Sequence, residues 1–486
     1  MATETLILLS LLVPLLTAVG IAVAGRWPNL REGVTLTGAL LLALVVYSLL
    51  PSILAGERPE LVLLEMMPGI RLAFRVEPLG MMFAGVAAFL WPVNSLYSIG
   101  YMRGNQEQNQ TRFYICFAIA LFAAMGVAFA GNLVTLFVFY EVLTLSTYPL
   151  VTHKGKSALK AGRVYLGILL FTSIGLLLPA IIWTWQATGT LEFTPGGILG
   201  GKVSGVALTA LSVLYFYGIG KAALMPVQRW LPAAMVAPTP VSALLHAVAV
   251  VKAGVFTVIK VAVYVFGLDT LASAPGIEWL LYVAGFTILA ASTIALYQDN
   301  LKRRLAYSTV SQLSYVVLGA AILAPISIVG AALHIVAHAF GKITLFFAAG
   351  SIYTAAHKTE ISQLNGIGYR MPWTMGAFTI GALSMIGVPP AVGFISKWYL
   401  LMGTFEAHQY LAFGIIIIST LLNAAYFVPI IYAAFFRPEA PDKKDDHGHG
   451  EAPWPIVVAL CITAGMTLVL FLFPEIPYQL AVQVGR

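Results

Sequence analysis

The chain has 486 residues, of which 59% are hydrophobic and only 10% are charged, and its net charge is +7. Soluble proteins carry about 25% charged residues, so this composition excludes an ordinary soluble domain. Basic residues are not gathered in a patch with interleaved aromatic residues, which argues against nucleic acid as a partner.

Apolar runs of about 20 residues recur along the chain, which is the length a helix needs to cross a bilayer core. A membrane β-barrel would instead show alternating segments of about ten residues. The first run lacks a small-residue cleavage site after a basic start, so we interpret it as a retained helix. The sequence predicts an all-α polytopic membrane protein with one membrane domain over residues 1–486. About 14 transmembrane helices are expected, centred near residues 14, 43, 88, 121, 141, 173, 216, 251, 287, 312, 341, 387, 422 and 464.

Lysine and arginine are unevenly distributed between alternate loops. Positive residues favour cytoplasmic loops, and with the N-terminus outside, 17 of them fall inside and 5 outside. We therefore predict that both termini lie outside, in a bacterial or archaeal cytoplasmic membrane. The inside set is Arg26, Arg31, Arg103, Arg112, Lys154, Lys156, Lys160, Arg163, Arg229, Lys302, Arg303, Arg304, Lys358, Arg370, Arg437, Lys443 and Lys444.

Three smaller features lie outside the expected spans or pack within them. Residues 57–77 alternate charged and apolar side chains and predict an external hairpin. The polar loop at 438–455 contains His447 and His449, which are weak metal ligands or part of a solvated loop. Cys116 and Cys461 lie far apart within apolar runs, so we expect packing and neither a disulfide framework nor a metal centre.

Two expected spans are interrupted by proline and glycine. One runs from Lys221 to Pro232, and the other from Gly387 to Lys397. Such breaks survive at membrane depth where protein or water satisfies the freed backbone groups, although ordinary proline kinks are the alternative. Paired broken spans indicate inverted repeats. These breaks fall five spans apart, which predicts two inverted five-helix repeats, at about 112–266 (spans 4–8) and about 277–436 (spans 9–13).

Charged residues occupy several of the same spans. A charge at bilayer depth costs roughly 2.5–3.5 kcal/mol, so such residues are kept mainly where charge moves or binds. Glu141 is the carboxylate placed well inside a span, and a cation partner would lower its cost of burial. Lys221 is the expected partner, either as a switch for proton release or as a static ion pair between helices.

The next span carries His246 and Lys252. Their spacing of six residues spreads them along and around a helix, as a relay requires, although a lone histidine often serves packing. Lys260 is interpreted as a helix-end lysine that snorkels and is left out of the relay. Lys397 lies beside the second break, in a position like that of Lys221.

His334, His338 and Lys342 are spaced four residues apart, on one face of one helix. This pattern suits proton hopping. A two-histidine metal site lacks the glutamate of the zinc-protease pattern, and polar packing remains open. Polar residues on the preceding span are expected to hold ordered water, namely Ser308, Ser311, Gln312 and Ser314.

The motifs around these residues resemble those of one family. Residues 230–246 (WLPAAMVAPTPVSALLH), 304–312 (RLAYSTVSQ), 334–342 (HIVAHAFGK) and 393–397 (GFISK) are similar to the antiporter-like subunits of complex I, Mrp cation/proton antiporters and energy-converting membrane hydrogenases. The resemblance covers nearly the whole chain. It implies a lateral proton route through the membrane centre, with half-channels to either side.

The resemblance also implies roles for these residues. Glu141 and Lys221 match the family's ion pair, and Lys252 with His246 matches the central connection. Lys397 matches the terminal exit residue. The other implied positions, which link to the second half-channel, are His334, His338 and Lys342.

Two departures favour the Mrp D subunit or its hydrogenase counterpart. Ala233 stands where complex I members usually carry an acidic residue, and the chain ends soon after the last span without a long lateral helix. The alternatives are a proton-pumping subunit of complex I, a stand-alone inverted-repeat solute transporter and an inert scaffold. Expected partners are other membrane subunits, lipids, protons and, as alternative cargo, Na⁺. No cofactor motif is present, so in a redox complex this chain would be the pump and not the catalyst.

Overall fold

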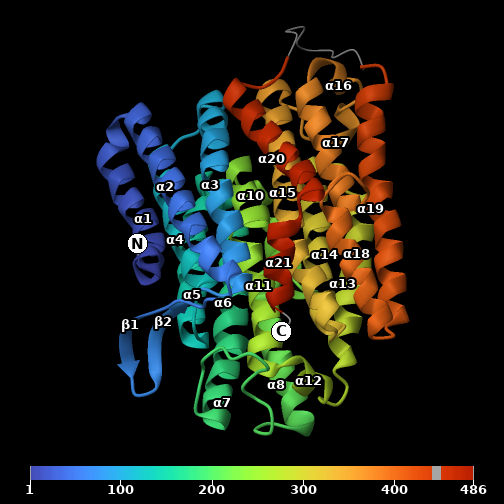
Figure 1. Ribbon diagram of the computed structural model, residues 1–486. Coiled ribbons are helices and arrows are strands. Elements are labelled where there is room, and N and C mark those ends of the chain that lie inside the picture. The colour runs from blue at the N-terminus through green and yellow to red at the C-terminus, as the bar shows by residue number, and fades with distance from the viewer. Residues whose placement is uncertain (1, 440–449, 485–486) are drawn as a thin grey trace.

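The computed structural model describes residues 2–439 and 450–484, most of which form helices that run side by side in one bundle (Figure 1). Within these residues, eleven helices are long and apolar enough to cross a membrane. They are α1 with its 3₁₀ extension (Thr3–Arg26), α2 (Pro28–Leu54), α3 (Pro78–Gly104), α4 (Gln110–Ala128), α5 (Leu133–Val151), the helix containing α6 and α7 (Gly155–Thr188), that containing α10 and α11 (Thr239–Phe266), α13 (Glu278–Leu296), α15 (Pro325–Ala356), α19 (Tyr410–Phe436) and α20 (Trp454–Leu472).

The polytopic all-helical fold is thereby confirmed, and the other three predicted spans also coincide with helices. They are α8 (Gly205–Gly218), α14 (Leu301–Ala321) and the pair α17 (Pro372–Ile386) and α18 (Gly393–Glu406). The first and third are cut short by the predicted breaks. The second, α14, is long enough, but its basic first turn and its buried Ser308, Ser311, Gln312 and Ser314 lower its mean hydropathy.

Both predicted breaks are present. α8 ends at Gly218, a short 3₁₀ turn spans Gly220–Ala222, and helix resumes at α9 (Trp230–Ala233). α17 ends at Ile386, where Gly387 has a φ of +88°, and α18 begins at Gly393. A side chain at position 387 would be strained by this φ and would also collide with the Lys397 side chain, so glycine is required twice over.

Helix bounds in the two halves of the chain recur at a constant interval. α13 begins at Glu278 and ends at Leu296, in each case 168 residues after the corresponding end of α4. Asn132 forms the N-cap of α5 and an isolated bridge with Glu192. Asn300 and Glu360, each 168 residues later, form the N-cap of α14 and the same type of bridge.

The external hairpin predicted for residues 57–77 is present as β1 (Glu60–Met67) paired antiparallel with β2 (Ile70–Arg75). It projects from the foot of the bundle in Figure 1. Three short helices complete the described elements: α12 (Leu268–Ala272), α16 (Ile367–Arg370) and α21 (Glu475–Val484). His447 and His449 lie outside the described residues, so their predicted roles are untested.

The centre of the bundle is α15, which is almost wholly buried. It packs against α3, α10, α14, α17, α18 and α20. The polar side chains of α15 therefore meet protein on all sides and not lipid, which is where buried polar groups in a membrane protein find partners.

Candidate functional site: a buried file of lysines and histidines

Lys221 lies at the first break, where the chain has left the regular helix of α8. Its side chain is fully buried, and its ammonium donates to the Tyr140 carbonyl oxygen at 2.8 Å and to Thr144 Oγ1 at 2.6 Å. The Nζ also lies 3.2 Å from the centre of the Tyr140 ring. Two oxygen acceptors and an aromatic face offset the cost of burying a lysine. Lys221 is thus held against α5.

The predicted ion pair between Lys221 and Glu141 is not formed. Both carboxylate oxygens of Glu141 are buried without a hydrogen-bond partner, and among the described residues no cation lies within 4.0 Å of them. Glu141 still acts on Lys221 through space. The physical reason is the direction of the lysine: it crosses α5 beside Tyr140 and Thr144, which flank Glu141 in sequence, and it bonds to their neutral oxygens.

Lys252 lies on α11 (Val250–Val261) and contacts a predicted member of the file on another helix. Its Nζ is 2.7 Å from Nδ1 of His338 on α15, and both side chains are buried. α11 also packs tightly on the first break, since a Cβ added to Gly254 would lie 2.4 Å from the carbonyl carbon of Lys221. The backbone of the first lysine and the helix of the second are therefore in direct contact, although no hydrogen bond joins their ammonium groups.

His246 is brought near the file but not into its contacts. It lies in a π-helical turn, Leu244–Val248, and π-helical turns are often found at functional sites. Both of its ring nitrogens are buried without a hydrogen-bond partner, and its ring packs 4.8 Å from that of Phe346, centre to centre. The packing role and the relay role predicted for this residue therefore both remain open.

The three titratable residues of α15 lie along one stretch of helix, but each contacts a different neighbour. His338 meets α11 as described, and His334 Nδ1 is 2.9 Å from Ser396 Oγ on α18. Lys342 donates to Ser308 Oγ on α14 at 2.7 Å. The two histidine rings are 6.2 Å apart, centre to centre. α15 thus connects three surrounding helices and does not form an isolated row.

A chain of hydrogen bonds continues from Lys342 to Lys397. Ser308 accepts from the Tyr426 hydroxyl at 3.0 Å, and Tyr426 also donates to Asn423 Oδ1. The amide of Asn423 donates to the Met385 carbonyl oxygen at 3.2 Å, and this oxygen also accepts from Lys397 Nζ at 3.1 Å. The second break therefore ends a continuous polar connection that starts at Lys342.

Lys397 is held mainly by backbone oxygens at the end of α17. Besides Met385, its Nζ donates to the Ile386 carbonyl oxygen at 2.8 Å and to Thr420 Oγ1 at 3.3 Å. These carbonyls are free because α17 ends at the break. Lys221 and Lys397 do not occupy the same position in their broken spans: Lys221 lies just after the first half-helix, whereas Lys397 lies in the second half-helix.

Lys260 does not snorkel to a helix end, as the sequence predicted. It is fully buried and forms an ion pair of 2.5 Å with Glu77, the residue that precedes α3. The rings of Phe193 and Tyr264 lie 4.4 and 5.2 Å from its Nζ. Glu77 comes from a loop that begins a distant helix, so sequence spacing along α11 gave no sign of this pair.

The sequence predictions missed most of the neutral partners of the file. Tyr140 and Thr144 flank Glu141, and Ser396 directly precedes Lys397, so proximity along the chain was the available signal. On α19, Thr420, Asn423 and Tyr426 contact the file. Their spacing of three residues within an otherwise apolar helix was a signal of one polar face.

Metal and cofactor binding find little support in this geometry. Within residues 2–439 and 450–484, no group of three or more His, Cys, Asp or Glu side chains is positioned to hold a metal ion. His334 and His338 instead contact Ser396 and Lys252. The absence of a cofactor stays a prediction from the sequence.

Residues 130–423, more than half of the chain, match the family described as NADH:quinone oxidoreductase/Mrp antiporter, TM. The chain belongs to this family. It is 31% identical over 440 residues to NADH-quinone oxidoreductase subunit N of Desulforudis audaxviator (strain MP104C), covering 90% of this chain and 87% of that protein. It is also 31% identical over 442 residues to a Na(+)/H(+) antiporter subunit of Alkalihalophilus pseudofirmus, covering 84% of this chain and 53% of that protein.

Solved structures of family members share the fold. A chain of the Mrp complex from Dietzia sp. DQ12-45-1b aligns with a TM-score of 0.85 at 21% identity, covering 99% of this chain and 97% of that chain. A chain of an archaeal membrane-bound sulfane sulfur reductase aligns with a TM-score of 0.84 at 23% identity, covering 99% and 96%. The predicted resemblance is confirmed, and the chain is a multi-pass membrane protein.

Proposed function

We propose that this chain translocates protons as an antiporter-like subunit of a multisubunit membrane complex. The observation that carries the proposal is the run of contacts through the protein interior, from Lys252 through His338 on one side and from Lys342 through Tyr426 to Lys397 on the other. A titratable group kept at bilayer depth and bonded to its neighbour is a feature of proton relays.

The first break would act as the switch for this relay. Burial favours a neutral lysine, whereas a close carboxylate favours a charged one. The Lys221 ammonium now bonds to oxygens on α5 one residue before and three residues after Glu141, so a small rotation of the lysine chain would bring it to the unpartnered carboxylate. Proton uptake would favour the paired position, and proton release the present one.

The parent complex that fits best is an Mrp-type cation/proton antiporter, in which this chain would be the Mrp D subunit, or a membrane-bound hydrogenase. The departure at Ala233 from the acidic residue usual in complex I members supports this choice. Na⁺ would then be exchanged for protons by the complex. The expected location is a bacterial or archaeal cytoplasmic membrane with both termini outside.

Complex I is the second candidate for the parent complex. It is favoured by the 31% identity to an NADH-quinone oxidoreductase subunit, which covers most of both chains. In that case, electron transfer in other subunits would drive the same relay, and the complex as a whole would be a redox enzyme.

We also propose that residues of about 112–266 and 277–436 are two inverted repeats. The constant interval of 168 residues between α4 and α13, and between the capped bridges at Asn132 and Asn300, supports this division. An odd number of spans in each repeat inverts the second copy relative to the first.

A stand-alone solute transporter has one observation in its favour. An open depression beside the first break is lined by Gln228, Arg229, Pro232 and Asn300, among others, although neither Lys221 nor Lys397 lines it. A solute transporter would work when this chain is expressed alone, whereas the proposed subunit would require its partners.

The test uses the complex purified in mild detergent from native membranes. Mass spectrometry of the co-purified subunits identifies the parent: small hydrophobic subunits alone indicate an antiporter, and iron–sulfur subunits indicate a redox pump. Proton transport by reconstituted complexes carrying Lys221→Ala or Lys397→Ala should be nearly abolished, with the exposed Lys156→Ala as control. Wild-type transport by either assembled variant would instead support the inert scaffold.

A further inference from the structure

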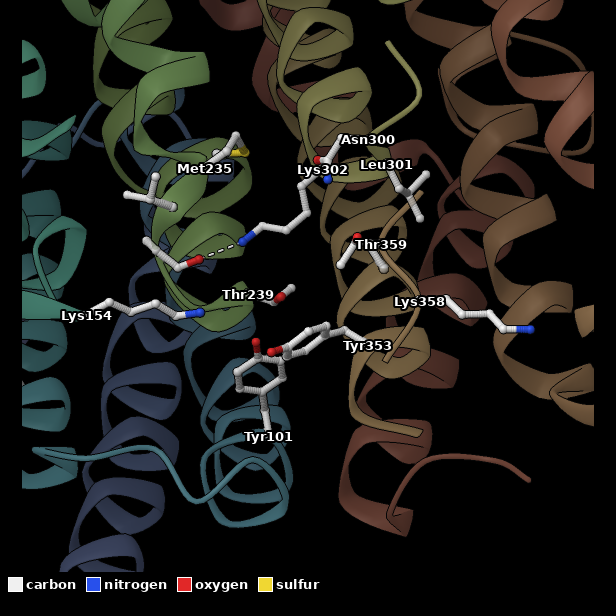
Figure 2. A pocket seen from close by; sticks show the side chains of 13 residues that line it. Tyr101, Lys154, Met235, Thr239, Asn300, Leu301, Lys302, Tyr353, Lys358 and Thr359 are labelled. Atoms are coloured by element: carbon white, nitrogen blue, oxygen red, sulfur yellow. Dashed lines mark hydrogen bonds between the residues drawn. The ribbon is translucent and has the colours of Figure 1, made fainter. Parts of the chain in front are cut away.

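A cavity of about 230 Å³ lies apart from the file, where the two halves of the chain meet. Its walls include the stretch from Met235 to Thr239, which enters α10, and the first residues of α14. The ends of α3 and α15 contribute Tyr101 and Tyr353. In Figure 2, the amino groups of Lys154 and Lys302 approach this space from different walls, and the two tyrosine hydroxyls point into it from a third.

The cavity carries positive charge that the protein does not neutralise by contact. Lys302 Nζ makes one hydrogen bond, to the Ala237 carbonyl oxygen at 2.6 Å. In the described part of the chain, neither Lys154 nor Lys302 has a carboxylate within 4.0 Å, and each repels the other through space. Glu107 is the acid that acts on Lys302, but its closest cationic contact is His153, at 3.9 Å. Two amino groups thus face a shared space with hydrogen-bonding capacity to spare.

Neutral donors complete the lining. The Tyr101 hydroxyl bonds to Thr239, and the rings of Tyr101 and Tyr353 are stacked with centres 6.4 Å apart. Stacking places both hydroxyls at the same side of the cavity, as Figure 2 shows. Lys358 also borders the cavity, but its side chain points away and lies 3.7 Å from Glu439, so it is not counted among the donors.

We propose that this cavity binds a phosphate group, supplied either by the headgroup of an anionic phospholipid or by inorganic phosphate. Lysine binds phosphate as a point charge, and hydroxyl donors complete the shell of a tetrahedral anion. Basic pockets between transmembrane helices at a positively charged membrane face bind lipid headgroups. Lys154 belongs to the most basic loop of the chain, which also carries Lys156 and Lys160.

Binding here would join the two halves of the molecule without entering the proton route. The Met235–Thr239 wall continues into the π-helical turn of His246, and the Lys302 wall continues along α14 to Ser308, the partner of Lys342. A phosphate held by both walls would fix the spacing of these two elements. The site is therefore separate from transport and goes beyond the proposed function.

The experiment measures binding to the purified, delipidated complex with two probes. Native mass spectrometry follows retention of dioleoylphosphatidylglycerol against dioleoylphosphatidylcholine, and equilibrium dialysis follows radiolabelled inorganic phosphate. The test variant is Lys154→Gln/Lys302→Gln, and the control is Lys156→Gln/Lys202→Gln, which removes the same charge from exposed positions. We expect the test variant to bind about tenfold or more weakly and the control to bind like wild type.

Single variants protect this result against misfolding. Lys154 is exposed and makes no side-chain hydrogen bond in the described part of the chain, so Lys154→Gln should fold and still weaken binding several-fold, whereas Lys154→Arg should retain it. Preference for the glycerol lipid over the choline lipid identifies a lipid headgroup, and binding of inorganic phosphate alone identifies the free anion. Either result supports the site. Failure of wild type to bind both probes, or equal binding by the test variant and the control, would overturn it.

Discussion

The two broken helices place their lysines in different electrical surroundings. At the first break, Lys221 reaches across to α5 and is bonded beside an unpartnered carboxylate, Glu141. At the second break, Lys397 folds back on its own span and bonds to the carbonyls of Met385 and Ile386 and to Thr420. One lysine thus has a charged neighbour that is not in contact, and the other has only neutral oxygens in contact.

This difference suggests unequal roles for the two breaks. A charged neighbour at variable distance changes the stability of a lysine's charge steeply, because Coulomb energies are large in a weakly polar interior. Neutral acceptors change it less. We therefore expect the first break to control proton uptake and the second to conduct protons between Lys342 and the exit.

The largest effect is expected from Glu141→Gln, which removes only the charge that distinguishes the first break. Without it the charged form of Lys221 loses its stabilising neighbour, so proton transport should fall by about tenfold or more. Transport is measured as the rate of internal acidification in proteoliposomes. Glu278→Gln, at an exposed position at the start of α13, is the matched control. An unchanged rate in Glu141→Gln would remove the proposed asymmetry between the breaks.

A steric change at the first break should have the next largest effect. The Cβ of Gly254→Ala would meet rigid backbone, 2.4 Å from both the Lys221 carbonyl carbon and the Ala222 nitrogen. The break and α11 must separate, which we expect to cost roughly 1–3 kcal/mol of stability and to slow transport. Thermal unfolding of the purified complex measures the first effect.

The control for this change is Gly414→Ala on α19, where an added Cβ has no atom within 4 Å. Equal unfolding temperatures for the two variants would show that α11 and the break are not tightly coupled.

An intermediate effect is expected from Tyr426→Phe, which interrupts the connection to the second break. The hydroxyl links Ser308 to Asn423, so its loss separates Lys342 from Lys397. We expect transport to slow by about three- to tenfold, since a water molecule can replace one link only in part. The exposed Tyr432→Phe on the same helix is the control. If both variants transport at the same rate, protons do not use this connection.

The smallest effect is expected from Ser396→Ala, which removes the single contact between His334 and α18. One neutral hydrogen bond contributes about 1 kcal/mol, and the ring keeps its place between Tyr315 and His338, so transport should fall by about twofold. The measurement is the same proteoliposome assay, with the buried Ser384→Ala on α17 as control. A tenfold loss would make His334 and Ser396 a second conducting route.

Much of the fold followed from the sequence because membrane crossing depends on local composition. A run of about 20 apolar residues must form a helix in a bilayer, where backbone groups have no other partners. All fourteen expected positions are helical, both breaks occur at the predicted proline and glycine clusters, and the hairpin at residues 57–77 is present. Burial of Lys221, Lys252, Lys342 and Lys397 followed from the same rule.

Which side chains touch was decided only by the tertiary structure. Pairing depends on the rotation and depth of each helix relative to its neighbours, which hydropathy along one chain does not specify. For this reason Lys221 bonds to Tyr140 and Thr144 and not to Glu141, Lys260 pairs with Glu77 from a distant loop, and the three residues of α15 diverge to three helices. The sequence by itself determined which charges are buried, and the packing of the helices determined what each of them meets.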